Sequence, residues 1–150
     1  MPQSLSRVLI HMAFSTKDRA PFLNESIRKE LFPYFIGVLQ NHNCQPIQIG
    51  GVEDHVHLLF ALSRTLTIAQ SVEHLKSGSS KWIKGKWADS ATFAWQQGYG
   101  SFSVGPRDID GVIAYIQGQA EHHRKFTFKE EFREMLSENR MEWDERNVWD

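Results

Sequence analysis

Hydrophobic and polar positions alternate along residues 6–14, and this period of two predicts a half-buried strand. Its apolar face consists of Val8, Ile10, Met12 and Phe14, and its other face of Arg7, Leu9, His11 and Ala13. Residues 50–62 repeat the pattern: His55 and His57 share one face, and apolar residues fill the other. The sequence therefore predicts two strands that each carry histidine on the face away from an apolar core.

Helical periods and turn residues divide the middle of the chain. Asn24 is the predicted cap of a helix to about residue 43, whose apolar residues recur every four positions: Ile27, Leu31, Phe35 and Leu39. A short strand is predicted at 46–49, and Gly50 and Gly51 are interpreted as the turn into the histidine strand. A helix over 67–87, interrupted at Gly78, and an irregular strand over 93–104 follow.

The last part of the chain is predicted to be helical. Pro106 precedes a predicted helix over 109–124, with a packing stripe of Ile109, Val112, Ile113 and Ile116. Thr127 and Glu130 form a capping box for a short final helix, and Trp143 or Trp149 is expected to dock the tail.

The order β-α-β-β-α-β-α is typical of an α+β, ferredoxin-like (split β-α-β) fold. We expect an antiparallel sheet with helices on one face and an added C-terminal helix for the other. With 41% hydrophobic residues, residues 1–150 are expected to form one domain. Cys44 is the only cysteine, and no stretch is typical of a signal peptide or a membrane span, so a protein of the reducing cytoplasm is expected.

Charge adds one candidate surface. The net charge of −1 is not that of a strongly basic nucleic-acid-binding domain. The stretch "KSGSSKWIKGK" at 76–86 nevertheless holds four lysines and no acid: Lys76, Lys81, Lys84 and Lys86. Alone it is typical of a solvated helix face, whereas beside a phosphate-cleaving site it would neutralise a nucleic-acid backbone.

The side chains that could bind a metal or take part in catalysis are predicted to lie on the sheet face opposite the core. Packing both apolar strand faces on the helices leaves His11, His55 and His57 together. The helix that follows the fourth strand carries Tyr115 and Gln119, which are neighbours at four-residue spacing. His122 and His123 come next, as partners of the helix-end dipole or as DNA contacts.

These residues resemble a known family. "DHVHLL" at 54–59, followed about sixty residues later by "YIQGQ" at 115–119, is similar to the HUH (His, bulky hydrophobe, His) single-tyrosine transposases of small bacterial insertion sequences. The resemblance extends to "HMAFSTKDR" at 11–19, "GYGSFSVG" at 98–105 and "HHRKFTFKEEF" at 122–132. It implies an enzyme that cuts and rejoins single-stranded DNA with hairpins at the ends of a mobile element, and that therefore acts on nucleoid DNA in the bacterial cytoplasm. Related host-resident proteins act on repeated palindromic hairpins, and the sequence fits either group.

The resemblance also implies roles for individual residues. Tyr115 would be the nucleophile that forms a 5′-phosphotyrosine link, and His55, His57 and Gln119 would hold a divalent metal, Mg²⁺ or Mn²⁺. Three neutral ligands bind magnesium weakly, so a substrate phosphate is expected to complete the site. The family is dimeric, which implies sites shared between two chains. The expected DNA contacts are Lys76, Lys81, Lys84, Lys86, His11, Arg107 and Arg124.

Some alternatives remain open from the residues alone. Glu53 rivals Gln119 as third ligand, and Tyr99 rivals Tyr115 as nucleophile. A non-catalytic or domesticated module that binds single-stranded nucleic-acid hairpins is the alternative function.

Overall fold

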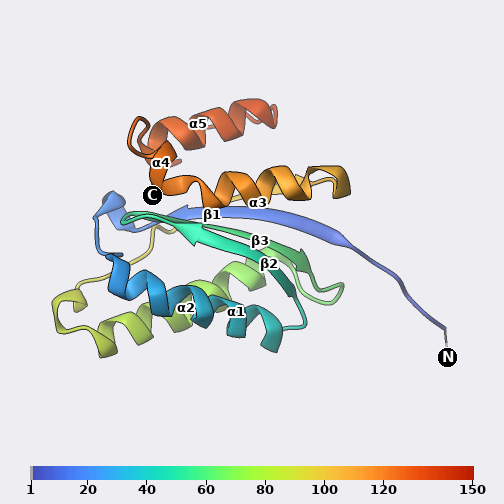
Figure 1. The fold of residues 1–150 in the computed structure, drawn as a ribbon, viewed down its shortest axis with the longest axis horizontal. Coiled ribbons are helices and arrows are strands. Elements are labelled where there is room, and N and C mark those ends of the chain that lie inside the picture. The colour runs from blue at the N-terminus through green and yellow to red at the C-terminus, as the bar shows by residue number, and fades with distance from the viewer. Residues whose placement is uncertain (1) are drawn as a thin grey trace.

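The two histidine strands lie side by side in an antiparallel sheet (Figure 1). The structure is a computed structural model and describes residues 2–150. Within these residues the sheet has four strands, β1 (Val8–Ser15), β2 (Gln45–Gly51), β3 (His55–Leu62) and β4 (Gly100–Val104), in the spatial order β2-β3-β1-β4. This topology confirms the predicted ferredoxin-like α+β fold.

The pairing of β1 with β3 brings the predicted faces together. Ala13 is the partner of His57, and His11 is the partner of Leu59, so His11 and His57 lie on the same side of the sheet. The opposite side is apolar, and its buried residues in these strands are Ile10, Met12, Phe14, Val56, Leu58 and Phe60. The alternation in the sequence is thus confirmed in both strands.

Two helices, α1 (Glu25–Asn41) and α2 (Ile68–Lys86), cover the apolar face. The Asn24 side chain caps α1 by accepting a hydrogen bond of 3.0 Å from the Ile27 amide. Thr67 caps α2 in a capping box with Gln70. The predicted spacing of four is confirmed in α1, whose buried residues are Ile27, Leu31, Phe35 and Leu39. These side chains and the sheet form the main core.

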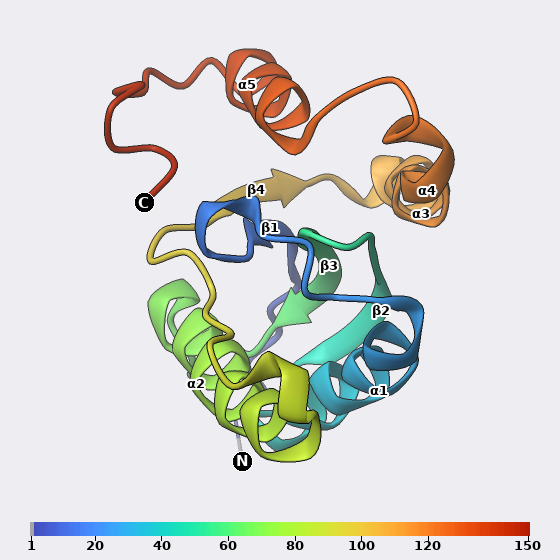
Figure 2. The same ribbon diagram turned by 90° about the vertical axis from the view of Figure 1, so that its left-hand side faces the viewer.

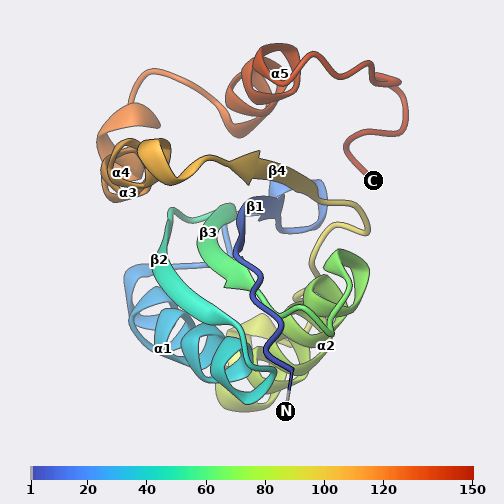
Figure 3. The ribbon, with the colours of Figure 1, turned by 90° about the vertical axis from the view of Figure 1, so that its right-hand side faces the viewer.

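The histidine face is covered by α3 (Ile109–Gln117), α4 (Gln119–His122) and α5 (Phe128–Glu138), so the sheet lies between two helical layers (Figure 2, Figure 3). The helix predicted over 109–124 is divided, because α3 ends at Gly118. The capping box of Thr127 and Glu130 begins α5, as predicted. A second apolar cluster fixes α5 to the sheet and consists of Ala13, Phe102, Phe128, Phe132, Met135 and Leu136.

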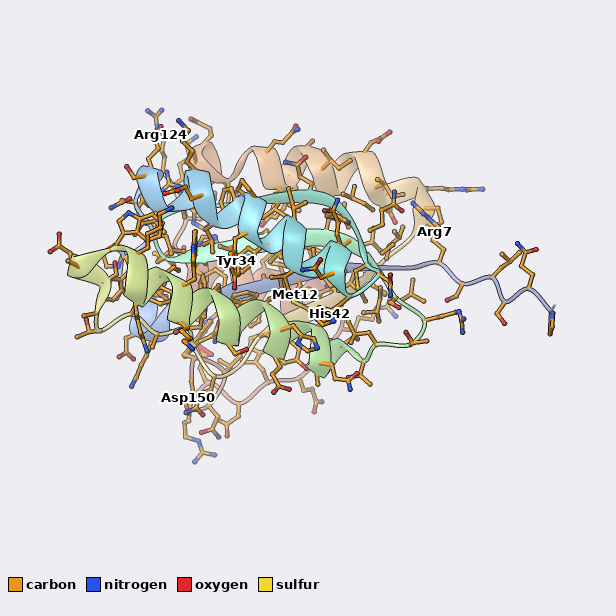
Figure 4. The ribbon with its side chains drawn as sticks, turned by 90° about the horizontal axis from the view of Figure 1, so that it is seen from below. Arg7, Met12, Tyr34, His42, Arg124 and Asp150 are labelled. Carbon is orange, nitrogen blue, oxygen red and sulfur yellow. The ribbon has the colours of Figure 1, made fainter. Side chains whose placement is uncertain are left out.

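Three glycines have roles other than those predicted. Gly50 and Gly51 are strand residues of β2, and the turn falls at residues 52–54. A Cβ on Gly50 would lie 2.7 Å from Ile116 Cγ2, so this glycine lets α3 approach the sheet. Gly78 does not interrupt α2; a Cβ there would lie 2.6 Å from the hydroxyl of Tyr34, which lies between α1 and α2 (Figure 4).

The segments outside the main elements are short or irregular. The strand predicted over 93–104 is regular only in β4, and Trp95 contributes an isolated bridge with Thr16. Trp149 packs against the second cluster, whereas Trp143 is exposed. Short 3-10 turns span Lys17–Arg19, Ala88–Ser90 and Pro106–Asp108. Among residues 2–150, no helix combines the length and apolarity needed to cross a membrane.

Candidate active site

Two buried imidazoles of β3 form the floor of the site. His55 and His57 are both completely inaccessible to solvent. Nδ1 of His55 donates to the Asp54 carboxylate at 2.7 Å, and Nδ1 of His57 lies 2.9 Å from Nε2 of His11. Since each Nδ1 has a partner, each ring is held with Nε2 toward the helices above.

Tyr115 of α3 and Gln119 of α4 lie above these histidines. The Gln119 side-chain oxygen is 2.9 Å from His55 Nε2. The ring centre of Tyr115 is 5.7 Å from that of His57 and 6.0 Å from that of His11. The structure therefore brings the predicted nucleophile and the three predicted metal ligands together.

All of these groups belong to one chain. Tyr115 lies beside His57 of its own polypeptide, on a helix that also packs on β2 of that polypeptide. The expected sharing of the site between two chains is therefore not needed to assemble it. Homodimerisation stays a prediction.

A buried carboxylate that the sequence analysis missed, Glu131 of α5, lies at the centre of the group. Its Oε1 is 3.3 Å from His55 Nε2 and 3.0 Å from His57 Nε2. Its Oε2 accepts hydrogen bonds from the Tyr115 hydroxyl and, at 2.9 Å, from the Gln119 amide. The signal was in the sequence, because Glu131 falls within an apolar stripe that includes Phe128 and Met135.

His122 and His123 also lie close to Glu131. Nε2 of His123 lies 3.1 Å from Glu131 Oε1, and Nε2 of His122 lies 3.4 Å from Oε2. Two groups of side chains have ligand atoms within 4.8 Å of one another, as metal binding requires: His55, His57 and Glu131; and His122, His123 and Glu131. Glu131 belongs to both.

The histidines keep Glu131 ionised. Burial alone would raise its pKa, but hydrogen bonds from His123, His55 and His57 outweigh burial and hold the pKa of Glu131 far below its usual range. Burial likewise opposes a charge on His55, yet its hydrogen bonds with Asp54 and Glu131 raise the pKa of His55 to about 9. Without a metal, a cationic imidazole thus balances the buried carboxylate.

The side chains of His11, His57 and Tyr115 are neutral. Burial, with the neighbouring His57, lowers the pKa of His11 to about 3, and burial also lowers the pKa of His57. Burial and the adjacent negative charge of Glu131 raise the pKa of Tyr115 well above its usual range. The phenol therefore stays protonated and donates to Glu131.

Two hollows lie at or beside this group. A groove of about 520 Å³ reaches Tyr115 and Glu131, and Arg107 and Glu134 line it. A second hollow of about 330 Å³ opens beside His123, and its lining includes both bases, such as Arg124 and Lys125, and the acids Glu53 and Asp54. The groove therefore gives a substrate access to the Tyr115 hydroxyl.

The predicted lysine surface is only partly available. Nζ of Lys76 donates to three backbone carbonyls, those of Gln96 at 2.7 Å, Gln97 at 3.3 Å and Gly98 at 2.6 Å. Lys76 therefore supports that loop, and its role as a DNA contact stays a prediction.

The other three lysines lie nearer to solvent. Lys86 is paired with Glu30. Lys81 and Lys84 are exposed, but α2 lies across the sheet from Tyr115 (Figure 2).

The rival residues lie elsewhere. Glu53 is exposed in the turn before β3 and takes part in neither group of possible metal ligands. Tyr99 is 39% exposed and lies near Lys76, and its loop precedes β4. The acid beside the histidines comes instead from α5, some eighty residues later in the chain.

The comparisons with known proteins agree on one class. The family model described as "Transposase IS200 like" matches residues 4–119. None of the curated proteins matches the chain.

Two solved structures share the fold. One is a protein from Deinococcus radiodurans that is assigned as a transposase. It aligns with a TM-score of 0.62 and 19% sequence identity, and the alignment covers 79% of this chain and 98% of the other. The second is a REP-associated tyrosine transposase bound to a REP hairpin. It aligns with a TM-score of 0.60 and 13% sequence identity, and the alignment covers 82% of this chain and 73% of the other. Because the family match spans most of the sequence and the fold agrees with it, this chain belongs to the IS200-like transposase family.

Proposed function

We propose that this transposase cuts and rejoins single-stranded DNA through a covalent link to Tyr115. The convergence of the Tyr115 hydroxyl with the imidazoles of His55 and His57 in one buried group carries the proposal. A phenol is a useful nucleophile for this purpose because its phosphodiester conserves the energy of the broken bond.

The step is a displacement at the scissile phosphorus. The Tyr115 oxygen forms a bond to phosphorus, and the bond from phosphorus to the 3′ oxygen breaks. The leaving oxygen takes a proton from water and becomes a 3′ hydroxyl, and the 5′ phosphate stays on Tyr115. The phenol proton is released to water as the new bond forms, and Glu131 Oε2 orients the hydroxyl beforehand by accepting its hydrogen bond. Attack by a 3′ hydroxyl on the phosphotyrosine reverses these changes and rejoins a strand.

His55, His57 and Gln119 are the proposed holders of the divalent metal. Their donor atoms suit manganese or zinc better than magnesium, and each histidine is oriented by a second partner, as metal-binding histidines are. When bound, the metal supplies positive charge that polarises a phosphate oxygen. Gln119 also donates to Glu131, so it fixes the carboxylate that faces the nucleophile.

Arg107 and Arg124 are the proposed contacts for the strand being cut, since Arg107 lines the groove that reaches Tyr115 and Arg124 lines the hollow beside His123. Lys81 and Lys84, across the sheet, are proposed to contact DNA away from the scissile phosphate, such as a hairpin stem. The similar structure that binds a REP hairpin supports a hairpin substrate.

The test is covalent capture. The protein is incubated with labelled single-stranded DNA that carries a hairpin, with Mn²⁺, and a denaturing gel is used to detect a protein–DNA adduct. Tyr115→Phe should abolish the adduct and leave hairpin binding within a few fold, because only the nucleophilic oxygen is lost. Tyr99→Phe is the matched control and should form the adduct normally. An adduct that survives in Tyr115→Phe would refute the role of Tyr115, and hairpin binding with no adduct in any protein would favour the non-catalytic alternative.

A further inference from the structure

The groove that reaches Tyr115 has an excess of negative charge. It lies over β4 between α3 and α5, and its lining includes the carboxylates of Asp108, Glu131, Glu134 and Glu138 and the guanidinium of Arg107. Glu131, Glu134 and Glu138 are three and four residues apart, so they share one side of α5. The basic residue next to Glu134, Arg133, is paired with Glu145 instead. A DNA phosphate would therefore be repelled from the interior of this groove.

The remaining lining of the groove suits a flat, uncharged ring. Apolar side chains from all three elements contribute to it: Phe102 and Val104 of β4, Val112 of α3 and Met135 of α5. Its volume of about 520 Å³ is within the range of about 300–1,000 Å³ for pockets that bind small molecules. A nucleobase requires such a combination of apolar walls and hydrogen-bond acceptors, because its faces stack and its amino group donates.

His11 adds a polar atom to the groove. This side chain is only 8% exposed, and its Nε2 lies 2.9 Å from Nδ1 of His57. Within residues 2–150, Nδ1 of His11 has no hydrogen-bond partner, and His11 lines the groove. That nitrogen is therefore left for a group that enters the groove. Tyr115 lines the same groove, so a ligand bound there would lie beside the proposed site of cleavage.

We infer that the groove binds one unpaired nucleobase of the strand that Tyr115 cuts, and that it selects a nucleobase with an amino group, such as adenine or cytosine, over thymine. This inference rests on the proposed function and adds a sequence preference to it. Beyond burial and Glu131, the charge of Glu134 raises the pKa of Tyr115, so Glu134 lies close to the nucleophile. The Glu134 carboxylate can accept a hydrogen bond from an amino group but has no proton for the O4 oxygen of thymine. Glu134 is therefore the specificity-determining residue.

The first test measures nucleobase binding without cleavage. The methionine methyl groups of the full chain are labelled with ¹³C for NMR, and deoxyadenosine, deoxycytidine and thymidine, which carry no phosphate, are titrated in turn. The Met135 signal should shift because Met135 lines the groove, whereas Met141, exposed after α5, reports nonspecific effects. Thymidine should bind at least about fivefold more weakly than the tighter of the other two nucleosides, the lower end of what one correct contact to a nucleobase provides.

Variants at two glutamates test the source of the preference. Glu134→Gln should bring the three nucleosides within about twofold of one another, because an amide can donate to thymine as well as accept from an amino group. Glu73→Gln makes the same change on α2, across the sheet (Figure 2), and should keep the preference. No shift of Met135, equal binding of thymidine by the unchanged protein, or an unaltered preference in Glu134→Gln would overturn the inference.

The second test uses the hairpin substrate of the adduct assay. Once the cut position is known from the gel, each adenine and cytosine beside it is replaced in turn by thymine. One replacement should lower the rate of adduct formation at least about fivefold in the unchanged protein and far less in Glu134→Gln. If no replacement matters although Tyr115→Phe abolishes the adduct, the inference fails and the proposed function stands. If Met135 shifts but no protein forms an adduct, the proposed function fails and only nucleobase binding is upheld.

Discussion

The close approach of α3 to the sheet should depend on Gly50, which has only a hydrogen atom where other residues have a Cβ. A Cβ at this position would lie 2.7 Å from Ile116 Cγ2 and 2.9 Å from the Ile116 carbonyl oxygen. Favourable contacts between such atoms begin near 3.5 Å, so Gly50→Ala must move α3 and β2 apart by about 0.7 Å. The carbonyl is part of the helix backbone, so a side-chain rotation cannot relieve this contact.

Gly50→Ala should lower both the stability of the protein and its rate of DNA cleavage. Overpacking at a buried contact costs about 1–3 kcal/mol, so the free energy of unfolding should fall by about 2 kcal/mol. Tyr115 precedes Ile116 and moves with it, and a displacement near 1 Å can cost about 100-fold in rate. Cleavage by the folded variant should therefore fall by about one to two orders of magnitude.

Urea denaturation and single-turnover cleavage measure these two effects separately. Gly37→Ala is the matched control, because a Cβ there meets nothing within 4 Å and lies in the interior of α1. It should leave cleavage unchanged and raise stability by up to about 1 kcal/mol. Wild-type stability and cleavage in Gly50→Ala would refute the claim that this glycine sets the position of Tyr115.

Three further predictions concern the lysines and the assembly of the site. Lys76→Met should lower the free energy of unfolding by about 2 kcal/mol in urea at neutral pH, because the charged bonds to three carbonyls are removed. Burial lowers the pKa of Lys76 to about 8 from 10.5, so the unfolding free energy of the unchanged protein should rise relative to that of the variant between these pH values. Lys81→Ala with Lys84→Ala should leave stability unchanged and lower the slope of log affinity against log salt by roughly 0.7–0.9 for each DNA phosphate that the variant no longer neutralises; an equal slope would show a merely solvated face. Mixed Tyr115→Phe and His57→Ala chains should stay inactive in strand cleavage after verified subunit exchange, because each chain completes its own site; recovered activity would instead establish sharing between chains.

The fold could be predicted from the sequence where local rules and tertiary contacts agree. The alternation through His55 and His57 identified the site face, and Thr127 with Glu130 marked the start of α5. The interpretation of Gly50 as a turn residue was wrong, because a glycine that permits close packing is identical in sequence to one that permits a turn. The contact that distinguishes them is 66 residues away.

The residues of the candidate site that belong to the sequence motifs were predicted, and the others were not. His55, His57, Tyr115 and Gln119 do converge. Glu131 was missed because acids are common on exposed helix faces, and its burial depends on α5 packing over β1 and β4. The contacts of Lys76 could not be predicted for the opposite reason, since a lysine on a basic helix is expected in solvent unless a distant loop supplies acceptors.

The two apolar clusters of this protein differ greatly in size, and this difference bears on how the site opens. His55 and His57 belong to β3, which pairs with a strand on each side above the main core. Glu131 belongs to α5, which the small cluster around Phe132 holds to the sheet. Because opening free energies follow local burial, α5 should open locally far more often than the sheet. The Glu131 carboxylate then leaves while the imidazoles stay in place, so release of the Tyr115 hydroxyl from its hydrogen bond would follow the opening rate of one helix rather than the unfolding rate of the domain.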